Sequence, residues 1–283
     1  MTWEYVEPAT VEEALAALAG EEARVLAGGV SLMVLLRNRL LTPRRLVNLK
    51  TVPGLDGIAV GPDGALRVGA LATHRALERS PLVRERWALL AQAAGHVGSP
   101  PIRNMGTIGG NVCHGDPAAD LPAALCALDA RLRVVGPGGE REIPAAEFHR
   151  GYYETALGPA EILREIVVPP APPGARGVYL KLRRTATDLA VVGVAAQLEV
   201  AHGRCRWARL AVGAAAAVPV RLRDAEACLV GRTPDEAAAR EAAALAGRAV
   251  DPLDDARGSA WYRRRMVEVM VARAVLAAAR REP

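Results

Sequence analysis

Four prolines in six residues, PPAPPG at positions 169–174, divide this 283-residue chain. Proline fixes φ and lacks a backbone N–H, so the segment fits neither a helix interior nor a central strand. We interpret it as a linker that precedes a separate domain at residues 175–283. A turn signal at residues 53–57 (PGLDG) divides the preceding part again. The expected domains are therefore lobes at residues 1–54 and 55–170, followed by the domain at 175–283.

Helix and strand patterns alternate on both sides of the linker. In the first lobe we expect a helix over residues 10–19, a strand over 24–27, a turn at Gly28-Gly29 and a helix that Ser31 caps. The second lobe shows strands at 58–60, 66–68 and 131–135 and a helix over 81–97. Beyond the linker we expect strands at 178–182, 191–200 and 205–212, and helices at 223–229, 234–246 and 258–281.

Composition narrows the function classes. The 36 basic and 31 acidic residues are spread along the chain without a basic block, which argues against nucleic-acid binding. No apolar run reaches the roughly 18 residues of a transmembrane segment, and the first ten residues do not resemble a secretory signal, so we expect a cytoplasmic protein. The cysteines fit no metal or iron–sulfur spacing; they lie at positions 113, 126, 205 and 228.

Two glycine-rich turns carry the strongest chemical signal. In the segment 27–31 (AGGVS), paired glycines let successive N–H groups converge at the start of a helix, where the helix dipole also favours an anion. The segment 107–111 (TIGGN) repeats this arrangement and adds hydroxyl and amide side chains. Two such turns suit a diphosphate. Neither matches the Walker or G-x-G-x-x-G pattern, and each alone is more often plain turn geometry than a phosphate site.

An acidic run follows the second turn. Asp116 is placed to cap a short helix, and Asp120 lies one helical turn further on. We interpret Asp116 as structural and Asp120 as a candidate partner for a ligand hydroxyl.

These segments resemble, in order and spacing, the FAD-binding medium subunit of molybdenum hydroxylases, a family that includes aerobic carbon monoxide dehydrogenase and bacterial xanthine dehydrogenase. The resemblance covers nearly the whole chain, and its TIGGN block with the DPAADLP tail is highly specific. The segments that carry it are GGVSLMVLLRNRLLTPRRLVNL, PIRNMGTIGGNVCHGDPAADLPAAL, EILREIVVP, YLKLRRTATDLAVVGVAAQLEV and DARGSAWYRRRMVEVMVARAV.

The resemblance implies an α+β architecture. It consists of a vanillyl-alcohol-oxidase or PCMH-type FAD-binding fold of two lobes, followed by a C-terminal α/β domain with an antiparallel sheet of three or more strands. Non-covalent FAD would lie between the lobes. The residues that would contact FAD by this resemblance are Ala27, Gly28, Gly29, Val30, Ser31, Thr107, Ile108, Gly109, Gly110, Asn111, Asp120, Leu163 and Lys181.

Two positions depart from the family pattern. Val30 stands where relatives commonly have glutamine or histidine, which removes a polar side-chain contact but leaves the backbone amides. Leu189 stands where many relatives have an aromatic residue, so stacking on the flavin from this position is lost.

By the same resemblance the chain is an electron-transfer subunit of an oxidoreductase complex. FAD would pass electrons from the [2Fe–2S] clusters of a small subunit to an external acceptor, while a large subunit holds the molybdenum cofactor; a dimer of heterotrimers is expected. No catalytic residue is expected in this chain. One alternative is a stand-alone FAD-dependent reductase of the same fold that uses NAD(P)H. Another is a module of this fold that has lost FAD and serves only in assembly, against which the presence of both glycine-rich turns, Asp120 and Lys181 argues.

Overall fold

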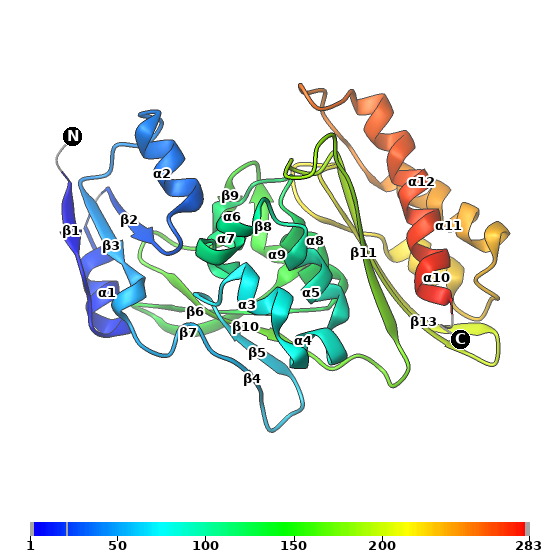
Figure 1. The fold of residues 1–283 in the computed structure, drawn as a ribbon, viewed down its shortest axis with the longest axis horizontal. Coiled ribbons are helices and arrows are strands. Elements are labelled where there is room, and N and C mark those ends of the chain that lie inside the picture. Colours follow the sequence, from blue (N-terminus) through cyan, green and yellow to red (C-terminus); the bar gives the residue numbers. More distant parts are fainter. Residues whose placement is uncertain (1–2, 21, 281–283) are drawn as a thin grey trace.

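The computed structural model describes residues 3–20 and 22–280, which form three sheets in chain order and one small hairpin (Figure 1). The first lobe holds a parallel sheet of order β1-β3-β2, made of β1 (Glu4–Val6), β2 (Ala23–Leu26) and β3 (Arg45–Asn48). Two helices, α1 (Val11–Leu18) and α2 (Val30–Arg37), accompany it, and the short η1 (Leu49–Thr51) follows β3.

The second lobe is built on an antiparallel sheet of order β4-β5-β10-β6-β7. Its strands are β4 (Ile58–Val60), β5 (Leu66–Gly69), β6 (Arg131–Gly136), β7 (Gly139–Pro144) and β10 (Ile162–Val168). The helices of this lobe are α3 (His74–Arg79), α4 (Pro81–Arg86), α5 (Ala88–Gly95), α6 (Pro100–Met105), α7 (Ile108–His114), α8 (Asp120–Ala127) and α9 (Ala145–Phe148). A hairpin of β8 (His149–Gly151) and β9 (Glu154–Thr155) lies against the end of α7.

Beyond the linker lies an antiparallel meander of β11 (Arg176–Leu182), β12 (Val192–Ala201), β13 (Arg204–Gly213) and β14 (Val220–Arg221). The helices α10 (Arg223–Leu229), α11 (Glu236–Ala249) and α12 (Ala260–Ala279) cover one face of this sheet (Figure 1). The other face packs on α5 and α8 of the second lobe. The α+β architecture with a C-terminal antiparallel sheet is therefore confirmed.

Three local predictions are wrong. The segment 81–97 is not one helix but two, because Trp87 leaves helical geometry at φ −131° and ψ 48° and its indole Nε1 donates to Pro169 O at 3.2 Å. The helix α2 starts two residues early, with Gly29 rather than Ser31 as its N-cap. Asp116 caps no helix; its carboxylate accepts from Ala118 N at 2.9 Å, and Ala119 precedes α8 as the N-cap.

No helix in the described part of the chain is both long enough and apolar enough to cross a membrane.

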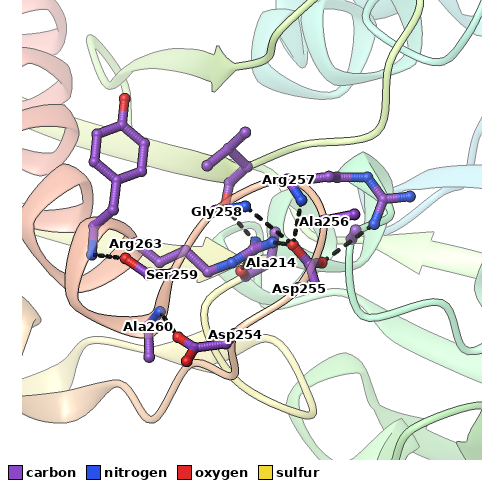
Figure 2. A network of polar contacts seen from close by, with 12 residues as sticks. Ala214, Asp254, Asp255, Ala256, Arg257, Gly258, Ser259, Ala260 and Arg263 are labelled. Carbon is purple, nitrogen blue, oxygen red and sulfur yellow. Dashed lines mark hydrogen bonds and ion pairs between the residues drawn. The ribbon is translucent and has the colours of Figure 1, made fainter.

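A buried arginine holds the start of α12 against the C-terminal sheet (Figure 2). Arg263 is 4% exposed, and its Nη1 donates to the backbone oxygens of Val191 at 2.8 Å and Ala214 at 2.9 Å. Its Nη2 binds the Asp255 carboxylate, which also accepts from the Gly258 amide at 3.2 Å. One side chain thus joins the loop before α12 to the segments flanking β12 and β13.

We expect the change Arg263→Met to lower the free energy of unfolding by about 3 kcal/mol, because two buried carbonyls and a carboxylate lose their donor. The matched control is Arg265→Met on the same helix, since Arg265 is 62% exposed and, among the described residues, pairs with Glu268 alone. Urea unfolding of both variants measures the difference. Equal stability of the two variants would show that the Arg263 contacts contribute little.

Candidate cofactor-binding site

The two glycine-rich turns, which come from different lobes, pack directly against each other. A Cβ atom on Gly28 would lie 2.3 Å from the backbone oxygen of Met105 and 2.9 Å from the Cα of Gly106. A Cβ atom on Gly110 would lie 3.7 Å from the Cβ of Ala27. Only glycine allows this approach at position 28, because any side chain would overlap the backbone of Met105 and Gly106, directly before the second turn.

The first turn presents backbone donors. Gly29 takes the left-handed conformation, with φ of 76°, and ends the turn as the N-cap of α2. Glycine has no side chain to accept a hydrogen bond, so the amides of Val30 and Ser31 in the first helical turn have no capping acceptor. Uncapped N–H groups and the positive end of the helix dipole together favour a bound anion. Since Val30 contributes only its backbone here, the loss of a polar side chain leaves this feature intact.

The backbone N–H groups of the second turn donate to acceptors elsewhere in this chain or to the side chain of Thr107. Ile108 N donates to Ala72 O at 2.9 Å, Gly109 N to Ala70 O at 2.8 Å, and Gly110 N to the hydroxyl of Thr107 at 3.1 Å. These amides thus have acceptors within the chain, and their contact with a phosphate stays a prediction. Gly109 is needed for packing, because a Cβ atom there would lie 2.6 Å from both the Cβ and the oxygen of Ala70.

What the second turn offers a ligand is an open backbone face and a side chain. Gly110 is exposed, and its missing side chain leaves space next to Ala27. The side-chain oxygen of Asn111 is buried without a hydrogen-bond partner among the described residues. A buried acceptor without a donor is costly, so Asn111 points to a ligand that carries hydroxyl or amide donors. The donor set and the open face fit a diphosphate with an attached polyol.

Asp120 and Lys181, both predicted ligand contacts, bind each other. The Nζ of Lys181 lies 2.7 Å from the Oδ2 of Asp120, and their side chains are 1% and 3% exposed. Lys181 also donates to His96 O at 3.1 Å, and the hydroxyl of Tyr179 donates to the Oδ1 of Asp120 at 2.8 Å. Burial raises the pKa of Asp120, and the Lys181 ammonium opposes this shift. The pair joins α8 of the second lobe to β11 of the C-terminal domain.

Sequence reasoning missed Tyr179 and Gly193, which complete this cluster. Tyr179 is 2% exposed, and burial together with the Asp120 charge raises its pKa well above the ordinary value. Gly193 lies opposite Lys181 on β12, and a Cβ atom there would lie 2.3 Å from the Tyr179 hydroxyl oxygen. The period of two along β11 puts residues 179 and 181 on one face, which was the only signal available in the sequence.

The remaining predicted positions lie apart from this cluster. Leu163, in β10, is 3% exposed and belongs to the second-lobe core. Leu189 is 36% exposed in the segment between β11 and β12. His114, at the end of α7, has its ring centroid 5.3 Å from that of Tyr153, a 61% exposed residue whose φ is 56°. Contacts of Leu163 with a cofactor stay a prediction.

The buried residue His74 packs against Gly106, directly before the second turn. His74 is 3% exposed, its backbone N donates to Gly106 O at 3.0 Å, and its ring fills the space where a side chain at Gly106 would lie. Its Nδ1 has no partner among the described residues. Burial, reinforced by the Arg103 charge, lowers the pKa of His74 from 6.5 to about 4. The imidazole is therefore neutral at pH 7.

Comparison with family models yields two matches that together span nearly the whole chain. Residues 1–171 match the FAD binding domain in molybdopterin dehydrogenase. Residues 177–278 match the CO dehydrogenase flavoprotein C-terminal domain. The boundary between these matches falls at the proline-rich linker.

Two curated relatives are similar over nearly their full length. The carbon monoxide dehydrogenase medium chain of Afipia carboxidovorans is 37% identical over 97% of this chain and 96% of its own. The 6-hydroxypseudooxynicotine dehydrogenase complex subunit alpha of Paenarthrobacter nicotinovorans is 35% identical over 99% and 95%. Among solved structures, the Cu,Mo-CO dehydrogenase matches with a TM-score of 0.96 and 36% identity over 98% of this chain and 97% of that one.

The neutral, buried state of His74 predicts a pH dependence of stability. Between pH 6.5 and about 4 the unfolded chain binds a proton at this position that the native chain does not. Acidification across this window therefore lowers the free energy of unfolding, by up to about 3 kcal/mol, and His74 has no such effect above pH 6.5. We expect His74→Leu to flatten this part of the pH profile in urea unfolding at pH 7.5, 6 and 5.

The control for this experiment is His202→Asn, because His202 is exposed and asparagine tolerates its φ of 51°. That variant should keep the wild-type pH profile. An unchanged slope in His74→Leu would contradict the assignment of a depressed pKa to His74.

Proposed function

We infer the function of this chain from its family. The chain belongs to the FAD-binding chains of molybdopterin dehydrogenases. It is an FAD-binding oxidoreductase chain of the carbon monoxide dehydrogenase and xanthine dehydrogenase type. Within that family, we propose that it transfers electrons and leaves substrate oxidation to another subunit. Bound FAD supplies the redox chemistry, and the residues of this chain hold it.

The observation that carries this proposal is the direct packing of the two glycine-rich turns beside the uncapped start of α2. Val30 and Ser31 offer backbone N–H groups to the pyrophosphate. Asn111 offers its unpaired side-chain oxygen to a hydroxyl of the ribityl or ribose portion. The absence of a side chain at Gly110 leaves room for the ligand next to Ala27. The resemblance adds further contacts of the bound cofactor at Ala27, Gly28, Gly29, Thr107, Ile108, Gly109, Asp120, Leu163 and Lys181.

The partners follow from the names of the relatives, which are called a medium chain and a complex subunit. We propose that this chain assembles with a large subunit that holds the molybdenum cofactor and a small subunit that holds two [2Fe–2S] clusters, as a dimer of heterotrimers in the cytoplasm. Electrons would enter from the small subunit and leave to an external acceptor. These names favour the subunit over the stand-alone NAD(P)H-dependent reductase.

The change Gly110→Val tests the site and the electron route together. Its Cβ atom would lie 3.7 Å from the Cβ of Ala27, and its nearest contact among the described residues would be the Thr107 hydroxyl at 2.9 Å. We expect the FAD content of the copurified complex to fall at least tenfold. A panel of carbon monoxide, xanthine, quinoline and glyceraldehyde identifies the substrate, which should still reduce the [2Fe–2S] centres seen by electron paramagnetic resonance. Added NAD⁺ or quinone should no longer reoxidise them.

Gly57→Val is the matched control, because a Cβ atom at Gly57 meets nothing within 4 Å. It should retain FAD and normal reoxidation. Full FAD content in Gly110→Val would overturn the placement of the cofactor at this turn. Unimpaired reoxidation in a flavin-free complex would overturn the electron-transfer role while leaving the binding site intact.

A further inference from the structure

Apart from the candidate cofactor site, a pocket with a volume of about 400 Å³ lies where the second lobe, the linker and the C-terminal sheet meet. Its walls are the Leu128-Asp129 turn after α8, the linker prolines, and side chains of β12 and β13. Asp120 lies at the other end of α8, which is about 12 Å long for its eight residues. The pocket is therefore separate from the Asp120–Lys181 cluster, and its volume falls in the range of small-molecule sites.

The base of this pocket contains a buried amide. Gln197 lies on β12 two residues after Ala195, so both side chains point to the face that packs on the second lobe. The residue is 5% exposed, yet its side chain makes no hydrogen bond with another described residue, and it lines the pocket. Its amide nitrogen and oxygen are not among the fully buried polar atoms that lack a partner, so they reach the solvent in the pocket and are free to pair with a ligand. Its hydrogen-bonding capacity is thus directed into the pocket.

The charged groups of the pocket neutralise each other. The Nε of Arg209 donates to the Oδ2 of Asp129 at 2.6 Å, and its guanidinium carbon lies 4.7 Å from the centre of the Trp207 ring. Arg221 donates to the other oxygen of Asp129 at 2.6 Å, and these contacts lower the pKa of Asp129 against the effect of burial. Arg221 also pairs with Glu226, so the two arginines and two carboxylates of this network balance in charge. The charged groups of the pocket therefore give it no net charge to attract an ionic ligand.

The shape of the pocket is fixed before any ligand arrives. Pro169 is anchored through its carbonyl by the Trp87 indole, and the carbonyl of Pro172 accepts from Ala175 N at 3.0 Å. Prolines lack N–H donors and have a restricted φ, so this wall is rigid and apolar. Trp207 supplies an aromatic surface on the β13 side. An apolar proline wall, an aromatic side chain and one donor–acceptor amide suit a planar ring that carries a complementary edge.

We propose that this pocket binds a neutral aromatic carboxamide, or a neutral planar heterocycle with the same donor–acceptor edge. The ring lies between the proline wall and the Trp207–Arg209 side, and its amide edge pairs with Gln197. This proposal is independent of the proposed electron-transfer function.

The test is calorimetric titration of the FAD-loaded full chain with benzamide, with benzoate and cyclohexanecarboxamide as probes of charge and planarity. We expect one saturable site for benzamide with a dissociation constant of about 1 mM, as for a fragment of its size. Benzoate and cyclohexanecarboxamide should bind at least tenfold more weakly. Gln197→Leu and Trp207→Leu should each weaken benzamide binding at least tenfold.

Trp261→Leu is the matched control, because Trp261 is 74% exposed on α12, and it should leave benzamide binding unchanged. If Gln197→Leu does not fold, Gln197→Glu serves in its place, since it keeps the shape and loses the amide donor. Absence of saturable benzamide binding to the wild type overturns the proposal. Benzamide binding that survives a folded Gln197 variant, or that benzoate matches, overturns it as well.

Discussion

The buried ion pair between Asp120 and Lys181 constrains how the second lobe and the C-terminal domain of this chain can assemble. Two charges removed from water are stabilising only when their geometry is good and the remaining hydrogen-bonding groups are satisfied. Tyr179 and the carbonyl of His96 meet that condition, at 2.8 Å and 3.1 Å. Because Tyr179 and Lys181 both lie on β11, a shift of one residue in its pairing would turn both away from Asp120. The register of the C-terminal sheet is thus coupled to the position of α8.

The cofactor site depends on this assembly as much as on its own turns. One turn belongs to the first lobe and the other to the second, and they meet where Gly28 lacks a side chain against the Met105 carbonyl. The second turn donates backbone hydrogen bonds to the carbonyls of Ala70 and Ala72, and the residue before it, Gly106, accepts one from the His74 amide. The ion pair adds the C-terminal domain at the start of α8, close after the second turn in sequence. The candidate cofactor site therefore draws on residues of both lobes, and α8, which follows the second turn, joins them to the C-terminal domain.

Much of this organisation could be predicted from the sequence where local chemistry decides it. The hydroxyl of Thr10 caps α1, the helix over 223–229 has the predicted bounds, and the prolines at 169–174 separate the sheets. Sequence reasoning did not reveal features that depend on contacts between residues far apart in the sequence. Trp87 breaks a helix because its indole reaches the linker, 82 residues away. The amides of Ile108 and Gly109 bind carbonyls of the second lobe, which no pattern within 107–111 reveals. The pairing of Asp120 with Lys181 spans 61 residues, and the sequence shows only two isolated polar positions.

The titratable groups near the turns are held in states that do not oppose a bound anion. Burial raises the pKa of the Cys113 thiol on α7 to about 12, so no thiolate forms there at neutral pH. The charge of Asp120 is matched by the Lys181 ammonium at 2.7 Å. His74 adds no charge, since its pKa is about 4. The uncapped start of α2 consequently meets a diphosphate without competition from these neighbours, although its own contribution is only a partial positive charge. Burial, which elsewhere serves packing, here also determines the electrostatics of the site.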